Sequence, residues 1–203
     1  TIGVEDLQGQ VSEYDTLLKV LKEISPVPIG FEEIAGGSKG YYSLGEQRIA
    51  IQAGMSQLQT IKTMVHEIAH SKLHAIDKDA TPEEKAQRPD QYTREVQAEG
   101  VAYVVCQHLG LDTSDYSFSY VASWSTGKEL SELKSSLDTI RTASAEIIDA
   151  IQHQKERRPE KEKLCMEREE EQYPCLFQAL AKRKRRKIVP EAEKKRKSYE
   201  AIR

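Results

Sequence analysis

The chain has 203 residues, of which 38% are apolar and 31% are charged. This length suits one ordinary domain with an appendage and is short for two full domains. No apolar run approaches the ~20 residues that span a bilayer, and the first residues lack the basic and apolar regions of a secretory signal. We therefore expect a cytoplasmic protein with no membrane partner.

Charge divides the chain into two parts. Residues 154–203 carry 17 Lys or Arg and 10 Asp or Glu, a net charge of +7, whereas residues 1–153 hold the remaining 13 and 23, a net charge of −10. We predict one domain over residues 1–153, in which residues 1–35 are a linker or a lead-in helix. A charged, basic C-terminal tail, helical or disordered, is predicted over residues 154–203.

The cysteines are odd in number and show no Cys-x-x-Cys spacing. This pattern favours reduced thiols in the cytosol over disulfides or a zinc site built on cysteines. The chain does not begin with Met, and we expect it to be a piece of a longer protein or a processed one.

Apolar spacing predicts the secondary structure in chain order. Helices are expected over residues 10–24, 56–73, 93–109 and 128–153, and short strands over 29–34, 41–44 and 48–51. This order predicts an α+β fold in which a small sheet of two or three strands is combined with several helices. The strand over residues 48–51 is either a core strand or an edge strand along which a peptide substrate aligns by β-addition.

The sequence HEIAH at residues 66–70 lies in the middle of a predicted helix. Two imidazoles at i and i+4 share one helix face, about 6 Å apart along the axis, so His66 and His70 can bind one Zn²⁺. Glu67 beside them is the candidate catalytic base, which takes a proton from water that zinc has acidified. His74 extends the row but lies about 12 Å along the axis from His66. We interpret it as a residue that supports the ligands or packs near them.

Catalytic zinc normally has three protein ligands, and the next long helix offers Glu95 and Glu99 at i and i+4. This arrangement resembles the thermolysin-like zincins, in which a Glu further along the chain is the third ligand and an acidic residue one turn later orients a ligand His. The resemblance implies that Glu95 binds the metal and that Glu99 accepts a hydrogen bond from His66 or His70. The reverse assignment of the two glutamates stays open.

A peptidase with this site also needs a group that stabilises the oxyanion of the transition state. Tyr92 directly precedes the helix that carries the two glutamates, and Tyr120 lies in the Ser- and Tyr-rich segment beyond that helix. Both are candidates, and no spacing argument selects between them.

Three sequence blocks together resemble a known family. The blocks are HEIAHSKLH at residues 66–74, YTREVQAE at 92–99 and YVASW at 120–124, and a predicted long helix follows the last one. In order and spacing they resemble the C-terminal zincin-like metallopeptidase domain of ArdC antirestriction proteins, over roughly residues 40–153. The HExxH motif alone is shared by many families, including the ImmA/IrrE peptidases.

The resemblance implies a zinc-dependent peptidase that hydrolyses a bond in a protein or peptide substrate. It places zinc at His66, His70 and Glu95 and makes Glu67 the base. ArdC proteins are carried on conjugative plasmids and integrative elements, and are held to protect incoming DNA from host restriction. They pair the peptidase domain with an N-terminal single-stranded-DNA-binding domain, which we expect to lie outside this chain.

Two other functions stay open. In the first, the zinc fold is a non-catalytic scaffold in a DNA-binding antirestriction module. Nucleic acid is then bound by the missing N-terminal domain or by the basic runs at residues 182–187 and 194–197, which suit salt-dependent phosphate contacts. The tail is otherwise a solvated segment that keeps an acidic domain soluble. In the second, the chain is a regulatory peptidase of the ImmA/IrrE kind that cleaves a repressor.

Overall fold

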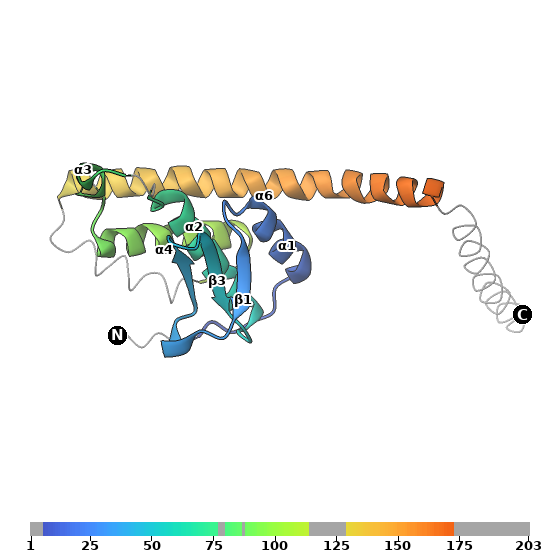
Figure 1. Cartoon of the computed structure of the whole chain (residues 1–203), viewed down its shortest axis with the longest axis horizontal. Coiled ribbons are helices and arrows are strands. Elements are labelled where there is room, and N and C mark those ends of the chain that lie inside the picture. The colour runs from blue at the N-terminus through green and yellow to red at the C-terminus, as the bar shows by residue number, and fades with distance from the viewer. Residues whose placement is uncertain (1–5, 77–79, 87, 114–128, 173–203) are drawn as a thin grey trace, which may run out of the picture. The chain divides into compact units, whose positions relative to one another are not determined.

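A computed structural model describes residues 6–76, 80–86, 88–113 and 129–172. The chain separates into two units, Thr1–Lys155 and Glu156–Arg203, and the first unit contains the sheet and the helices around it. In chain order the elements are α1 (Tyr14–Ile24), β1 (Ile29–Glu32), the 3-10 turn η1 (Ala35–Gly37), β2 (Gly40–Ser43), β3 (Arg48–Gln52), α2 (Gln57–Leu73), α3 (Pro82–Ala86), α4 (Gln91–His108) and α6 (Leu130–Gln172) (Figure 1). The predicted α+β fold with a small sheet is confirmed.

The three strands form one sheet in the order β1-β3-β2. β1 runs parallel to β3, with Ile29 opposite Ile49, and β2 runs antiparallel to β3, with Tyr42 opposite the same Ile49. β3 is therefore the central strand, and Ile49, Ala50 and Ile51 are completely buried. The interpretation of residues 48–51 as an edge strand is wrong, because both sides of β3 are already paired. The strand β2 forms an edge of this sheet.

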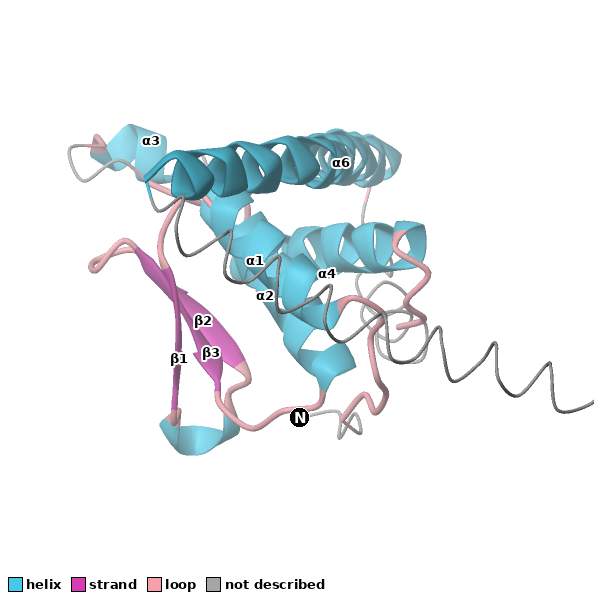
Figure 2. Cartoon of the chain, turned by 90° about the vertical axis from the view of Figure 1, so that its right-hand side faces the viewer, coloured by secondary structure: helices cyan, strands magenta, loops and turns pink. Residues whose placement is uncertain are grey.

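Helix α2 begins where the sequence predicts. The hydroxyl of Ser56 accepts a hydrogen bond from the Gln59 N–H at 3.1 Å, which satisfies one of the backbone donors exposed at a helix N-terminus. The helix contacts β2 and β3 on one side and α4 on another, so it lies between the sheet and the second long helix (Figure 2). Any side chain on α2 that is turned toward β2 and α4 is thereby held between rigid elements.

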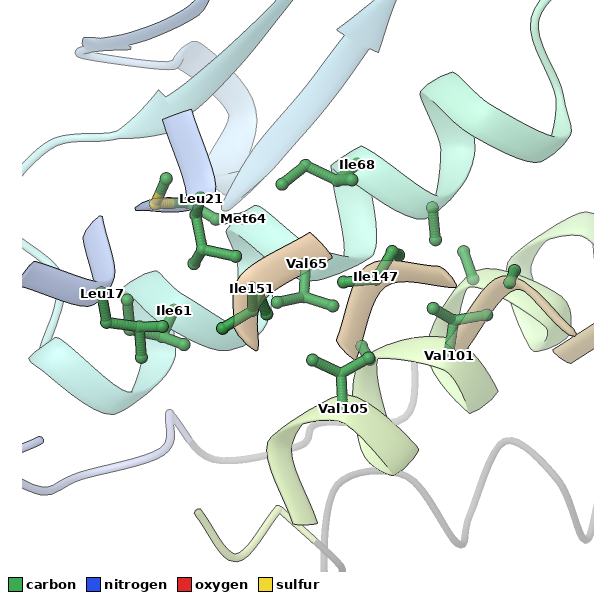
Figure 3. Packing of buried hydrophobic residues seen from close by; sticks show 14 of the residues in the cluster. Leu17, Leu21, Ile61, Met64, Val65, Ile68, Val101, Val105, Ile147 and Ile151 are labelled. Carbon is green, nitrogen blue, oxygen red and sulfur yellow. The ribbon is translucent and has the colours of Figure 1, made fainter. Parts of the chain in front are cut away.

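The hydrophobic core lies around α2 and takes side chains from four helices (Figure 3). Full burial of an aliphatic side chain of this kind stabilises a fold by about 1.5–3 kcal/mol. The labelled core residues are Leu17 and Leu21 of α1, Ile61, Met64, Val65 and Ile68 of α2, Val101 and Val105 of α4, and Ile147 and Ile151 of α6.

Helix α6 packs closely on α4 at one glycine. A β-carbon on Gly100 would lie 2.7 Å from Cδ1 and 3.2 Å from Cγ1 of Ile140, closer than real β-carbons approach other atoms. The missing side chain therefore lets the two helices come together directly beside Glu99. The helix predicted to end near residue 153 continues to Gln172, through the charged segment that follows. None of the described helices has the combination of length and apolar character that crossing a bilayer requires.

Candidate metal centre

Four polar residues spaced four apart line a cleft of about 550 Å³: Lys62, His66 and His70 on one face of α2, and His74 directly after its last residue. The walls of this cleft come from β2 and the residues before it, from α2, and from the first turns of α4 with the segment that precedes them. Residues at i and i+4 on a helix lie on the same face, so the sequence spacing explains the row. The candidate site is thus a row of basic and imidazole groups under an edge strand.

Three side chains bring their donor atoms together at the centre of the row. His66 Nε2 lies 3.1 Å from His70 Nε2, and Glu95 Oε2 lies 3.5 Å from each of these nitrogens. Donors that surround one zinc ion tetrahedrally at about 2.0–2.1 Å are separated from one another by about 3.3–3.4 Å. The three donors therefore have the chemistry and the mutual spacing of a three-residue zinc site.

The two glutamates of α4 occupy different positions. The Glu95 side chain is 40% exposed and faces the two imidazoles, whereas the Glu99 side chain is only 1% exposed. Glu99 Oε2 lies 3.2 Å from Nδ1 of His66, on the other side of the ring from Glu95, although the ring is not oriented for a hydrogen bond. This geometry favours Glu95 as the ligand and places Glu99 where it can hold His66 by charge.

Opposite charges meet in the metal-free site, where His66 carries an added proton near neutral pH. Burial lowers the pKa of His66, but its contacts with Glu95 and Glu99 outweigh burial and raise the pKa to about 9. Burial likewise raises the pKa of Glu99, but His66 and Lys62 outweigh it and lower the pKa to about 2. The contacts of Glu95 with His66 and His70 lower its pKa far below the usual range. Both glutamates are therefore ionised near neutral pH.

Glu67 lines the same cleft, one residue after the first histidine. It is 6% exposed, and burial raises its pKa, with partial opposition from the nearby His66 and His70. Among the described residues, none donates a hydrogen bond to its carboxylate. A carboxylate with a raised pKa and uncommitted oxygens, next to a cation site, can act as a general base.

His74 lies behind the metal centre, and it is buried. Its Nδ1 lies 3.0 Å from Nδ1 of His70, and an Arg88 N–H donates to its backbone oxygen at 2.6 Å at the end of α2. Burial lowers the pKa of His74 to about 4, so the ring is neutral near pH 7. The contact with His70 matches the interpretation of His74 as a supporting residue.

Sequence reasoning missed two residues of the site. Lys62 stands one turn before His66, and its place in the row of four was the signal that could have revealed it. Gly40 of β2 gave no signal, because its role depends on a distant contact: a β-carbon there would lie 2.8 Å from Cγ2 of Thr63 and 3.2 Å from Cγ of Glu67. The absence of a side chain lets β2 lie directly against the candidate base.

Of the two tyrosines proposed to stabilise the transition state, the structure describes only Tyr92, and it does not bring that side chain into the cleft. Tyr92 is 40% exposed and is not among the residues that line the cleft, and Tyr120 lies outside the described residues. Tyr41 and Tyr42 of β2 line the cleft. The Tyr41 hydroxyl is engaged, since it donates to Glu32 at 2.9 Å.

Comparison with known proteins supports the same class of domain. Residues 26–107 match the family model described as the IrrE N-terminal-like domain, a peptidase family, and this segment contains the three donors and Glu67. The α+β fold is compatible with a zincin-like domain of this family. The match supports a relation to the ImmA/IrrE peptidases, and it does not extend to an ArdC-type role.

The comparisons with curated proteins and with solved structures give less information than the family match. An uncharacterized protein of Bacillus anthracis is 26% identical over 133 residues, which are 65% of this chain and 20% of that protein. The chain therefore spans about a fifth of the length of this curated relative. No solved structure matches the chain significantly.

Proposed function

We propose that the chain is a zinc-dependent peptidase that cleaves a protein or peptide partner. The observation that carries this proposal is the triangle formed by His66 Nε2, His70 Nε2 and Glu95 Oε2, with sides of 3.1, 3.5 and 3.5 Å. Its spacing fits a tetrahedral ion and leaves one position for water or substrate. The match to a peptidase family supports the proposal independently.

The chemistry follows from the residues beside the triangle. Zinc held by the three donors would supply Lewis acidity, which polarises a peptide carbonyl and lowers the pKa of water. Glu67 takes a proton from the attacking water and passes it to the amine nitrogen as the C–N bond breaks. Its burial supports the first of these transfers, because a carboxylate with a raised pKa is a stronger base and takes the proton from water more readily.

An extended peptide is the substrate shape that the cleft favours. β2 is an edge strand, it lines the cleft beside Glu67, and among the described strands only β3 pairs with it. Its outer side can therefore add a strand of substrate through backbone hydrogen bonds. A peptide bound in this way would run past the ends of the three donor side chains.

The proposal is tested on the full chain with zinc analysis and a random-sequence peptide library as the probe substrate. Wild type is expected to hold one zinc and to cleave peptides. Glu67→Gln is expected to keep the zinc and to lose cleavage, and His66→Ala is expected to lose both. A wild-type chain that binds no zinc, or a Glu67→Gln chain that cleaves as wild type does, would contradict the proposal.

The biological setting has two candidates, and both concern the same site. The match to the IrrE N-terminal-like domain favours a regulatory peptidase that cleaves a repressor. The ArdC-type antirestriction role rests on the three sequence blocks, of which the block at residues 120–124 lies outside the described residues. A DNA-protection assay distinguishes the regulatory role from the antirestriction role.

The same assay also tests the third function, in which the zinc fold is a non-catalytic scaffold that protects DNA by binding it. Such a scaffold keeps protection in Glu67→Gln and loses protection at raised salt or after truncation at residue 153.

A further inference from the structure

A line of buried polar side chains extends from the metal centre into the helix packing. His70 Nδ1 lies 3.0 Å from Nδ1 of His74, His74 Nε2 lies 3.0 Å from Oε1 of Gln97, and the Gln97 amide donates to the Ser136 hydroxyl at 3.2 Å. His74, Gln97 and Ser136 are each at most 6% exposed. The line thus joins α2, α4 and α6 through buried contacts.

The donors and acceptors along this line determine one another. A neutral imidazole carries one N–H, and the carbonyl oxygen of Gln97 can only accept, so His74 Nε2 is the donor. His74 Nδ1 then has no hydrogen and accepts from Nδ1 of His70. Because its only hydrogen is on Nδ1, His70 presents a free lone pair on Nε2, the nitrogen that faces His66 and Glu95.

The opposite arrangement would prevent metal binding. If the Gln97 amide turned over, its NH₂ group would donate to His74 Nε2, and His74 Nδ1 would donate to His70. His70 Nε2 would then carry the hydrogen and could not bind a cation. The Ser136 hydroxyl can donate or accept, so it satisfies Gln97 in either arrangement. The orientation of one buried amide therefore decides whether His70 can act as a ligand.

We infer that His74, Gln97 and Ser136 form a positioning relay that keeps His70 in the tautomer able to bind metal. The inference rests on the proposed metal centre and adds residues that the HExxH motif does not include. The two ligand histidines are held differently: His66 lies beside the carboxylate of Glu99, whereas His70 is held by a neutral chain. The relay also links the site to α6.

Two substitutions of nearly equal size separate a relay from simple packing. Gln97→Glu keeps an oxygen that accepts from His74 Nε2, whereas Gln97→Met removes the acceptor. We expect Gln97→Met and His74→Phe each to lower zinc affinity by about 10–100-fold, the usual effect of losing a group that orients a metal ligand. Gln97→Glu is expected to bind zinc more tightly than Gln97→Met. If packing alone mattered, the buried charge of Gln97→Glu would make it the weaker binder of the pair.

Zinc affinity is measured by competition with a chelator on the full chain, with His108→Phe as the matched control. His108 is exposed on α4 and contacts Gln152, so its loss should leave affinity unchanged. Nitrogen NMR of the zinc-bound chain should show hydrogen on Nδ1 of His70 and on Nε2 of His74. Equal affinities of wild type, His74→Phe and Gln97→Met would overturn the relay alone, whereas a wild-type chain without zinc would overturn the proposed function. If His74→Phe does not fold, the comparison of zinc affinity between Gln97→Met and Gln97→Glu tests the relay.

Discussion

Lys62 Nζ lies 2.6 Å from Oε2 of Glu99, and neither side chain is more than 4% exposed. Burial lowers the pKa of Lys62, and the charge of Glu99 opposes that shift. The same carboxylate lies beside His66, so one buried anion connects the packing of α2 and α4 to a proposed metal ligand. This link makes the stability of the domain and the geometry of its site depend on the same residue.

Removal of the buried cation should strongly destabilise the metal-free domain. We expect Lys62→Met to lower the free energy of unfolding by about 3–5 kcal/mol, because it removes one partner of the buried ion pair with Glu99. Urea denaturation measures the change. Lys72→Met is the control on the same helix, since its pair with Glu146 is partly exposed and is worth less than about 1 kcal/mol. Equal effects of the two substitutions would show that the buried pair has no special role.

The contact between Gly40 and Glu67 predicts an effect on catalysis without an effect on metal binding. In Gly40→Ala the new β-carbon would press on Glu67 and Thr63, so either β2 or the candidate base must shift. We expect a fall in kcat of at least about tenfold, equivalent to ~1.4 kcal/mol, with one zinc retained. Gly45→Ala is the control, because no atom lies within 4 Å of its added β-carbon. Unchanged kcat in Gly40→Ala would contradict the prediction.

Replacement of Glu95 should remove the metal and leave the fold in place. Its side chain is 40% exposed, so Glu95→Ala should change the unfolding free energy of the metal-free chain by less than about 1 kcal/mol. Zinc content should fall well below one per chain, because two histidines remain as ligands. Elemental analysis and urea denaturation measure the two effects, and Glu83→Ala, at an exposed position on α3, is the control. Full zinc occupancy in Glu95→Ala would show that Glu95 is not a ligand.

His74 should make the metal-free domain sensitive to mild acid. Its pKa is about 4 in the folded chain and about 6.5 when unfolded, so its contribution is complete above pH 6.5 and is lost as the pH falls toward 4. The loss amounts to about 3 kcal/mol. Unfolding measured between pH 6.5 and 4 should show a shallower decline for His74→Phe than for wild type. Parallel curves for the two chains would exclude this contribution.

Most of the secondary structure could be predicted from local sequence signals. The spacing of apolar residues located α2, α4 and the three strands to within a few residues, and Ser56 marked the start of α2 as the structure shows. The order of the strands could not be predicted, because the place of β3 depends on contacts with segments on both sides of it. The end of α6 was also missed, since the charged residues after 153 carry no apolar periodicity to reveal a helix.

The residues of the candidate site also fall into two groups, those that the sequence locates and those that it does not. His66, Glu67 and His70 lie within five residues on one helix, so helical geometry alone fixes their relative positions. Lys62, Gln97 and Gly40 act through contacts between elements that are distant in sequence, and a single sequence does not contain those contacts. Tyr92 was proposed from chemical need without a geometric argument, and the structure leaves it exposed.

The segment that matches the peptidase family, residues 26–107, contains the metal donors but not the whole core around them. Leu17 and Leu21 of α1 and Ile147 and Ile151 of α6 pack against α2 from outside that segment. A fragment cut to the matched length would leave open to water the side of α2 that these four residues cover. We therefore expect the smallest unit that unfolds cooperatively to be longer than the matched segment and to include the first half of α6.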